Sequence, residues 1–368
     1  MAGPVYSTNS VNRPEEQPAA IVTDDASGPD ASSLPTGTRR HRLLLVVVLL
    51  VHAGLLAVQS SRNAPNLDET AHLPSGYSHW EFGNFTLYRV NPPLIRMWAA
   101  APLLVMEPQT NWAGYSDTLF SRAEFSVGVD FHRANGMQAF RYFTLARWVL
   151  IPVSLIAAWV CWRWGTELFG PDAGLLAATL WCFCPNSLAW GASITPDTGA
   201  AAFGVLASWR FWHWLRRPIW QNAVIAGVAL GLIQLTKTSW IILFGLWPLM
   251  WSAWWITAAS RSLPRPPLVQ LGIIIGMGFY LLNLGYGFED SGRALKEFTF
   301  VSQTLGGQDA HENGGNRFQD SWIGELPVPV PANYVRGIDV QKYDFERGKW
   351  SYLLGEQKKG GWWYYYLY

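Results

Sequence analysis

The chain has 368 residues, of which 50% are hydrophobic, 15% are aromatic and only 14% are charged. A soluble globular domain carries roughly 25% charged residues, so this composition excludes an ordinary soluble protein and indicates that lipid is part of its solvent. A net charge of +1 excludes a bulk electrostatic attraction to nucleic acid, and we expect no nucleic-acid partner.

The N-terminal segment, residues 1–38, is rich in Pro, Ser, Asp and Ala and has little apolar content. Such a segment cannot bury enough surface to offset the entropy of ordering, so we predict a disordered cytoplasmic tail. The first apolar run, Leu43–Gln59, follows the basic residues Arg39, Arg40 and Arg42. A signal anchor and a cleaved signal peptide both fit this pattern. The long tail, the missing small-residue cleavage site and the later apolar runs favour the anchor.

Six further runs approach the roughly 20 apolar residues that a membrane-spanning helix needs. Trp and Tyr crowd their ends, as expected of interfacial aromatic belts. The six runs are Tyr142–Trp162, Ala173–Ala192, Thr198–Leu215, Ala223–Thr236, Trp240–Ala258 and Leu268–Tyr286. The terminal run, residues 361–368, is apolar to its last residue. It predicts the start of one more span and leaves open whether the chain is a fragment.

Basic residues test this count, because Lys and Arg concentrate in the cytoplasmic loops of membrane proteins. If the runs alternate from a cytoplasmic N-terminus, the short outer turns receive Lys237 alone. The inner connections receive Arg163, Arg210, Arg216, Arg217, Arg261 and Arg265. The sequence therefore predicts an all-α polytopic integral membrane protein with about seven complete transmembrane helices plus the start of an eighth. A catalytic module, residues 39–287, would include a large external loop at 60–140, and a second external loop would cover 288–360.

Two adjacent carboxylates, Asp68 and Glu69, lie near the start of the first external loop, and His72 follows one helical turn later. On a helix Asp68 and His72 share a face. Partly desolvated adjacent carboxylates split their pKa values, so one can act as a general base while the other holds a metal or an acceptor. A structural role fits equally well. Asn66 would then cap the helix with Glu69 at the third position, and first-turn acids suit the helix dipole.

The segment Asn91-Pro92-Pro93-Leu94 predicts a helix start, with Asn91 as the cap and Pro92 at the first helical position. The apolar run that follows, Leu94–Val105, is too short to cross a membrane, so we expect an interfacial helix on the outer surface. Arg96 would then face the lipid headgroups, either as a substrate contact or as a snorkelling surface arginine.

Three more charged residues are candidates for a binding site on the outer side. Arg147 lies inside the second apolar run, where a charge is costly and marks a functional site. Arg147 and Lys237 together could cradle a phosphate, since Arg offers a planar fork and Lys a point charge. Capping of a span end is the alternative for Lys237. Asp197, at an external helix start, either shapes a pocket or compensates the helix dipole.

Taken in order, these pieces resemble the glycosyltransferase C superfamily. The resemblance is to the protein O-mannosyltransferase group and its bacterial relatives, which include the aminoarabinose transferases of lipid A. It covers about residue 43 to the end. The matching pieces are Asp68-Glu69 with His72, Asn91-Pro92-Pro93-Leu94, Ala146-Arg147, Leu168-Phe169-Gly170, Thr195-Pro196-Asp197, Gly231–Lys237, Leu354-Gly355-Glu356 and Gly361–Tyr366.

The resemblance implies inverting transfer of a sugar from a polyprenyl-phosphate donor on the periplasmic or lumenal face, in a bacterial inner membrane. Asp68 would match the catalytic aspartate that takes the acceptor proton. A lipid-phosphate leaving group needs charge stabilisation, for which Arg147 and Lys237 are the candidates. The acceptor is a lipid, a protein or a glycan. No cofactor is certain, and a divalent cation, with unknown ligands, stays open.

The chain departs from the family pattern at the two positions before Pro-Pro, and its His72 lies one residue later than the histidine of the mannosyltransferase pattern. The aminoarabinose transferases carry an acidic residue and a lysine before Pro-Pro, and the mannosyltransferases carry a histidine. Here these places hold Val90 and Asn91, which argues against assigning either named activity. Two other classes also stay open. A transporter would use Arg147 and the external acids as a substrate or proton path, and in a structural membrane protein the acids would be only caps.

Overall fold

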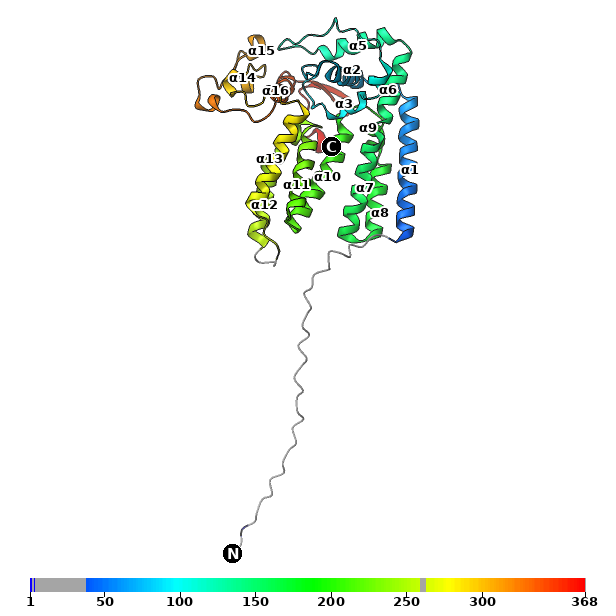
Figure 1. The fold of residues 1–368 in the computed structure, drawn as a ribbon, viewed down its shortest axis with the longest axis vertical. Coiled ribbons are helices and arrows are strands. Elements are labelled where there is room, and N and C mark those ends of the chain that lie inside the picture. The colour runs from blue at the N-terminus through cyan, green and yellow to red at the C-terminus, as the bar shows by residue number, and fades with distance from the viewer. Residues whose placement is uncertain (2, 4–37, 259–262, 368) are drawn as a thin grey trace.

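The computed structural model describes residues 1, 3, 38–258 and 263–367. Long helices lie side by side, and the shorter elements gather at one end of them (Figure 1). Residues 4–37, which make up most of the predicted tail, lie outside the described residues.

Each of the seven predicted apolar runs forms helix. The helices that contain them are α1 (Arg39–Arg62), α6 (Gln138–Trp148) with α7 (Ile151–Phe169), α8 (Pro171–Phe183) with α9 (Pro185–Gly191), α10 (Pro196–Arg216), α11 (Trp220–Gln234), the 3-10 helix η1 (Thr238–Ile242) with α12 (Leu243–Ala258), and α13 (Leu268–Gly285). The structure therefore confirms the predicted fold class, a helical membrane protein.

The count of seven complete spans is not established. Within the described residues, four helical stretches are long and apolar enough to cross a membrane: α1, the 32-residue stretch of α6 and α7, η1 with α12, and α13. The run Ala173–Ala192 is broken, since Cys184 is extended before Pro185. A residue before proline is disfavoured in the helical conformation, so α8 stops there.

Small residues bring the long helices together. A Cβ on Gly174 of α8 would lie 2.0 Å from the Thr166 hydroxyl of α7, so only glycine fits at this crossing. Such small contacts are typical of helices that pack within lipid. A buried core of large rings joins α10 to α12, where Phe211 stacks on Trp247 with ring centroids 4.3 Å apart.

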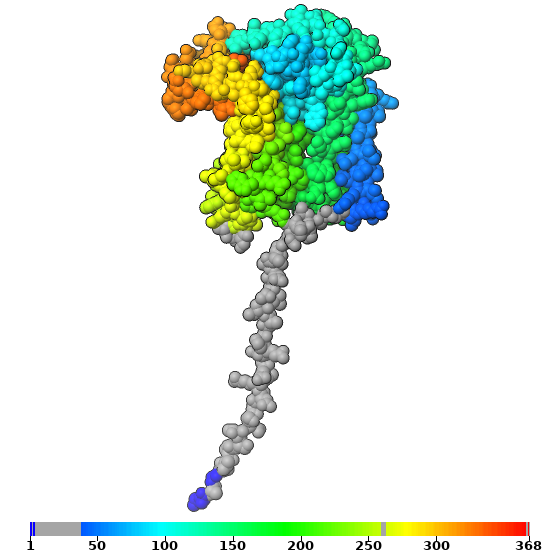
Figure 2. All heavy atoms as spheres, in the orientation of Figure 1, coloured from blue at the N-terminus to red at the C-terminus, as the bar shows by residue number. Residues whose placement is uncertain are grey.

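The two loops that the sequence predicts to be external form a cap over one end of the helices, which we name the external cap (Figures 1 and 2). The first contains α2 (Leu67–Phe82), α3 (Leu94–Ala100), α4 (Leu103–Met106) and α5 (Ala123–Asn135). The second contains η3 (Leu295–Glu297), α14 (Gln303–Gly306), α15 (Ala310–Asn313), η4 (Trp322–Glu325) and α16 (Ala332–Glu346). Arg122 of the first loop forms an ion pair with Asp344 of the second, so the two loops contact each other directly.

A two-stranded antiparallel hairpin follows α16. Strands β1 (Trp350–Leu353) and β2 (Glu356–Lys359) pair with Trp350 opposite Lys359. A short 3-10 helix, η5 (Tyr365–Leu367), follows the hairpin. No α-helix begins between residues 360 and 367, so the predicted start of a further membrane helix stays a prediction.

The expected interfacial helix over Leu94–Val105 is two short helices. α3 ends at Ala100 and α4 begins at Leu103, with a turn between them. A proline at position 102, before α4, explains the break, because proline cannot donate an interior helical hydrogen bond.

Glu346 ties the end of α16 to the start of α14. Its carboxylate accepts hydrogen bonds from the backbone N–H groups of Gln303 (2.7 Å) and Thr304 (3.0 Å), and His311 lies 2.9 Å away. Burial by itself raises the pKa of the Glu346 carboxyl. These bonds and one from the Thr304 hydroxyl outweigh that effect and lower the pKa to about 2.

We expect the stabilisation from Glu346 to be complete above pH ~4.5, the ordinary pKa of glutamate, and to disappear as the pH falls toward ~2. Glu346→Gln should therefore lower the thermal unfolding midpoint at pH 7 and lose that effect at pH ~2. Paired melting curves across this range measure the difference. A gap between the two proteins that does not change with pH would contradict the assignment.

Candidate active site

Helix α2 begins with the capping box that the sequence predicts. The Asn66 side chain accepts a hydrogen bond from the Glu69 N–H (3.0 Å), and the Glu69 carboxylate accepts one from the Asn66 N–H (2.9 Å). This cap fixes the first turn, so the two adjacent acids have different surroundings: Asp68 is exposed, whereas Glu69 is only 1% exposed.

Glu69 forms a buried bidentate ion pair with Arg147 of α6. Both oxygens of Glu69 accept from the guanidinium at 2.7 Å, and the N–H of Ile194 adds a fourth donor at 2.8 Å. Arg147 also donates to the backbone carbonyls of Ser60, Asn63 and Ala64. This network fastens α2 to the end of α1, to α6 and to the loop before α10.

The network changes the roles predicted for Glu69 and Arg147. All five N–H donors of Arg147 are used, and the residue is 2% exposed, so a phosphate could bind it only if an existing bond broke. The Glu69 carboxylate likewise has four donors and no free lone pair facing a substrate. We therefore assign both residues to positioning the site and do not carry either one into the proposed chemistry.

Asp68 is the free acid of the pair. Its carboxylate has no hydrogen bond or ion pair with any residue that the structure describes. Asp68 also acts on Tyr88, whose pKa is raised to about 12, chiefly by burial, with Arg96 opposing and Asp68 adding to the rise. An exposed, unpartnered carboxylate can accept a proton from a bound hydroxyl group.

His72 lies one helical turn after Asp68 on α2. Its ring is 3% exposed and lies 4.4 Å, centroid to centroid, from the ring of Tyr88. Burial, and then the positive charge of Arg96, hold the pKa of His72 well below its ordinary value. His72 is therefore neutral at physiological pH and shapes the wall of the site without adding charge.

Arg96 does not face lipid headgroups, so the snorkelling interpretation is wrong. The side chain is 2% exposed, its guanidinium carbon lies 4.8 Å from the centroid of the Tyr88 ring, and it donates to the carbonyls of Tyr88 and Pro92. The reason is tertiary: α3 packs under α2, where the Arg96 carbonyl leaves no room for a Cβ at Gly76. Arg96 thus contacts both the ring and the backbone carbonyl of Tyr88.

Asn91 does not cap α3, contrary to the prediction from its sequence. The helix begins at Leu94, its cap is Pro93, and the Leu94 N–H donates to the carbonyl of Leu235 in the turn after α11. A bond from a distant segment replaces the local cap. Asn91 itself lies half-buried in the bend before α3.

Asp197 and Lys237 converge, as the predicted topology requires. Lys237 Nζ lies 3.0 Å from Asp197 Oδ1, and both side chains are about one third exposed. Lys237 keeps two ammonium N–H groups that could bind another acceptor. Ile194, three residues before Asp197, is the residue whose N–H binds Glu69, so the same network that holds Asp68 also holds this pair.

A large apolar cavity of about 710 Å³ opens between the end of α2, α3 and α13. Its wall includes Trp80, Met97 and Leu284, and also Leu235, which lies two residues before Lys237. The sequence did not predict this cavity, because it forms between segments about 200 residues apart in the chain.

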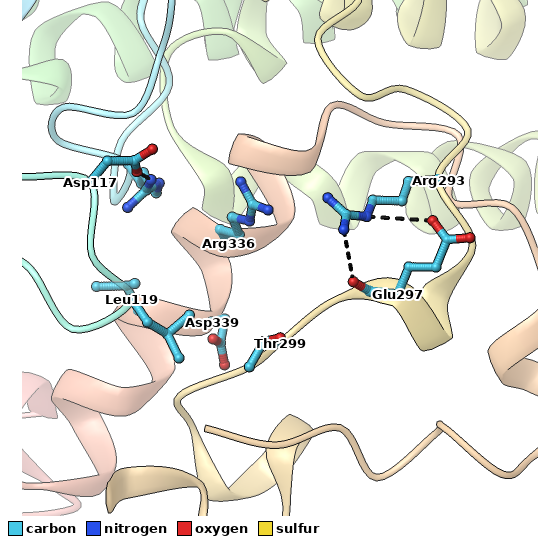
Figure 3. A pocket seen from close by; sticks show the side chains of 9 residues that line it. Asp117, Leu119, Arg293, Glu297, Thr299, Arg336 and Asp339 are labelled. Atoms are coloured by element: carbon cyan, nitrogen blue, oxygen red, sulfur yellow. Dashed lines mark hydrogen bonds and ion pairs between the residues drawn. The ribbon is translucent and has the colours of Figure 1, made fainter. Parts of the chain in front are cut away.

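A second cavity, of about 210 Å³, lies in the external cap (Figure 3). Arg89, Arg293 and Arg336 line it, together with acidic side chains that include Asp117 and Glu297. Arg89 pairs with Asp117, and Arg293 pairs with Glu297, so most of the charge in this cavity is already balanced. None of the residues predicted for the site lines it, and we do not assign the chemistry there.

Sequence reasoning missed Tyr88 and an acid–base network beside it. Glu124 of α5 is 3% exposed and accepts from Arg122 at 2.6 Å, while Arg122 also bonds Asp344 of α16. Both Glu124 and Arg122 contribute to the electrostatics of Tyr88. Tyr88 lies only three residues before Asn91. Its backbone has a positive φ of 60°, which the sequence does not predict for a tyrosine.

Within the described part of the chain, no group of three or more His, Cys, Asp or Glu side chains is arranged to hold a metal ion. We therefore assign no ligands to the divalent cation that the sequence analysis kept as an alternative.

The long apolar helices, with a charged site held at one of their ends, define an integral membrane protein. Residues 142–282 match the family model described as dolichyl-phosphate-mannose-protein mannosyltransferase, which confirms the resemblance seen in the sequence over this segment. The match covers less than half of the chain and therefore shows a likeness over this segment alone. No curated protein and no solved structure matches the chain.

Proposed function

We propose that the chain transfers a sugar from a polyprenyl-phosphate donor to an acceptor hydroxyl group, with inversion at the anomeric carbon and with Asp68 as the general base. The observation that carries this proposal is the contrast within the acid pair. Glu69 is buried and saturated with hydrogen bonds, whereas Asp68 is exposed, unpartnered and held in place by its neighbour.

The reaction divides among these groups as follows. Asp68 accepts the proton of the acceptor hydroxyl as its oxygen forms a bond to the anomeric carbon. The bond from that carbon to the phosphate oxygen breaks, and the lipid phosphate leaves with the electron pair. Lys237, oriented by Asp197, stabilises the charge that develops on the phosphate.

The apolar cavity beside Leu235 supports a lipid-linked donor. Its volume of about 710 Å³ and its apolar wall suit the first part of a polyprenyl chain, and Leu235 lies next to the loop that carries Lys237. We place the reaction on the external, periplasmic face of a bacterial inner membrane, in accordance with the distribution of basic residues. A lipid, a protein or a glycan can serve as the acceptor.

The direct test is an assay of membranes that contain the full chain. Radiolabelled polyprenyl-phosphate sugars are added, and label is followed into lipid, protein and glycan fractions. Transfer above that of membranes without the chain supports the proposal. No transfer from a panel of hexose and pentose donors, combined with solute uptake by the reconstituted chain, would favour the transporter instead.

Lys237→Gln should lower kcat/KM for transfer by about 10²- to 10³-fold, the usual effect of removing one donor that stabilises a developing negative charge. Asp197→Asn, which leaves the ammonium group in place, should have a smaller effect. Initial rates at several donor concentrations separate the two variants. A rate for Lys237→Gln close to that of the unaltered chain would remove Lys237 from the proposed site.

A further inference from the structure

The end of the bundle opposite the candidate active site holds an open cavity of about 430 Å³. Side chains of α1, α7 and α10 line it, among them Arg42, Arg163 and Arg210. Arg42 precedes Ser60, the α1 residue that contacts Arg147, by 18 positions. At a rise of 1.5 Å per residue this separation is ~27 Å, close to the thickness of a bilayer core.

The charges in this cavity do not balance. Its single lining acid, Glu167, already has three partners: Arg163 donates to it at 3.2 Å and Trp209 at 2.9 Å, and His213 lies 2.9 Å away. Arg42 and Arg210 have no carboxylate partner among the residues that the structure describes. The Arg210 guanidinium lies over the Trp209 ring, 4.1 Å from its centroid, which orients it and leaves its N–H donors free.

The start of α1 adds to the excess positive charge. The helix begins at Arg39, its first turn contains no acidic residue, and Thr38 makes no side-chain capping bond. A helix N-terminus already carries a partial positive charge, so arginines in its first turn are unfavourable unless an anion is near. Among the described residues the carboxylate that contacts this turn is Asp172 of α8, which lies 2.9 Å from His41 and is 99% exposed. A bound anion would offset both the dipole and the unpaired guanidinium groups.

The surroundings of the cavity are those of a lipid-facing surface. Leu43 and Val47 of α1 are 58% and 56% exposed, and Trp159, which lines the cavity, is 38% exposed. A soluble anion could use only the arginines, whereas a phospholipid could use both the arginines and the apolar flank. The positive-inside rule places this end at the cytoplasmic leaflet, where anionic lipids gather.

We propose that this cavity binds the phosphate group of an anionic phospholipid, with the acyl chains lying along α1 and α7. Arg42 and Arg210 bind the phosphate oxygens, and Arg163 stays paired with Glu167. The site is separate from the proposed sugar transfer and does not depend on it.

The test is native mass spectrometry of the purified full chain, titrated with phosphatidylglycerol or phosphatidylcholine of identical acyl chains. We expect preferential binding of phosphatidylglycerol. Arg42→Gln combined with Arg210→Gln should weaken it about 30-fold, since each arginine near an anionic surface contributes a factor of roughly five. The matched control, Arg216→Gln with Arg217→Gln, removes two charges from the same end of α10 without altering the cavity wall and should leave binding unchanged.

Equal losses in the two double variants would show general charge attraction and overturn the proposal, and so would equal binding of the two lipids. Glycerol 3-phosphate tests the headgroup alone, and binding as tight as that of the lipid would also overturn it. A further measurement needs no variant. The unfolding midpoint of the unaltered chain should rise with added phosphatidylglycerol and not with phosphatidylcholine, and an equal response to both would again contradict the site.

Discussion

Asp68→Asn is expected to lower the rate of sugar transfer by about 10²- to 10⁴-fold, the range typical for loss of a general base. The protein should fold and insert as before, because the Asp68 side chain is exposed and bonds no other described residue. The measurement is transfer from a labelled polyprenyl-phosphate sugar, normalised to the amount of folded chain in the membrane.

The matched control for this experiment is Asp320→Asn. Asp320 is also an exposed acid of the external cap without a bond to another described residue, but it lies in the second loop. This variant should transfer sugar at the rate of the unaltered chain. An Asp68→Asn protein that transferred sugar at half the normal rate or better would rule out Asp68 as the base and would return the acid pair to a purely structural role.

Loss of one partner of the buried Glu69–Arg147 pair is expected to destabilise the fold by about 3–5 kcal/mol, because the other charge stays buried without compensation. Arg147→Leu leaves the Glu69 carboxylate, which is 1% exposed, without its bidentate donor. The double variant Glu69→Leu with Arg147→Leu should recover part of the loss. Unfolding in mixed detergent micelles, followed by tryptophan fluorescence, measures each value.

An exposed ion pair supplies the control for this prediction. Lys296 and Glu325 lie 2.8 Å apart in the external cap and are 40% and 65% exposed. Lys296→Ala should cost less than about 1 kcal/mol, the usual limit for surface pairs. A further variant, Glu69→Gln, tests whether Glu69 has only a structural role beside Asp68. A Glu69→Gln protein that kept its stability but lost transfer would show that Glu69 takes part in the chemistry.

Local chemistry was enough to predict how α2 begins. Asn66 and Glu69 are three residues apart, and their reciprocal hydrogen bonds require only a helical first turn. The positions of the long helices also follow from the sequence, because a run of apolar residues in lipid must satisfy its backbone hydrogen bonds within itself. The meeting of Asp197 and Lys237 follows from topology, since Asp197 begins α10 and Lys237 follows the end of α11, at the same end of these neighbouring helices.

The sequence alone therefore determined the class of protein, the helical stretches and the side on which the acids gather, since periodicity, capping and charge distribution are short-range properties. Only the tertiary structure shows which partners each charged group contacts. Arg147 and Glu69 are 78 residues apart, and their pairing uses the donors that a phosphate would need. Arg96 is buried because α3 packs beneath α2, and the large apolar cavity forms between α2, α3 and α13. Such contacts depend on how whole helices pack, which no local pattern records.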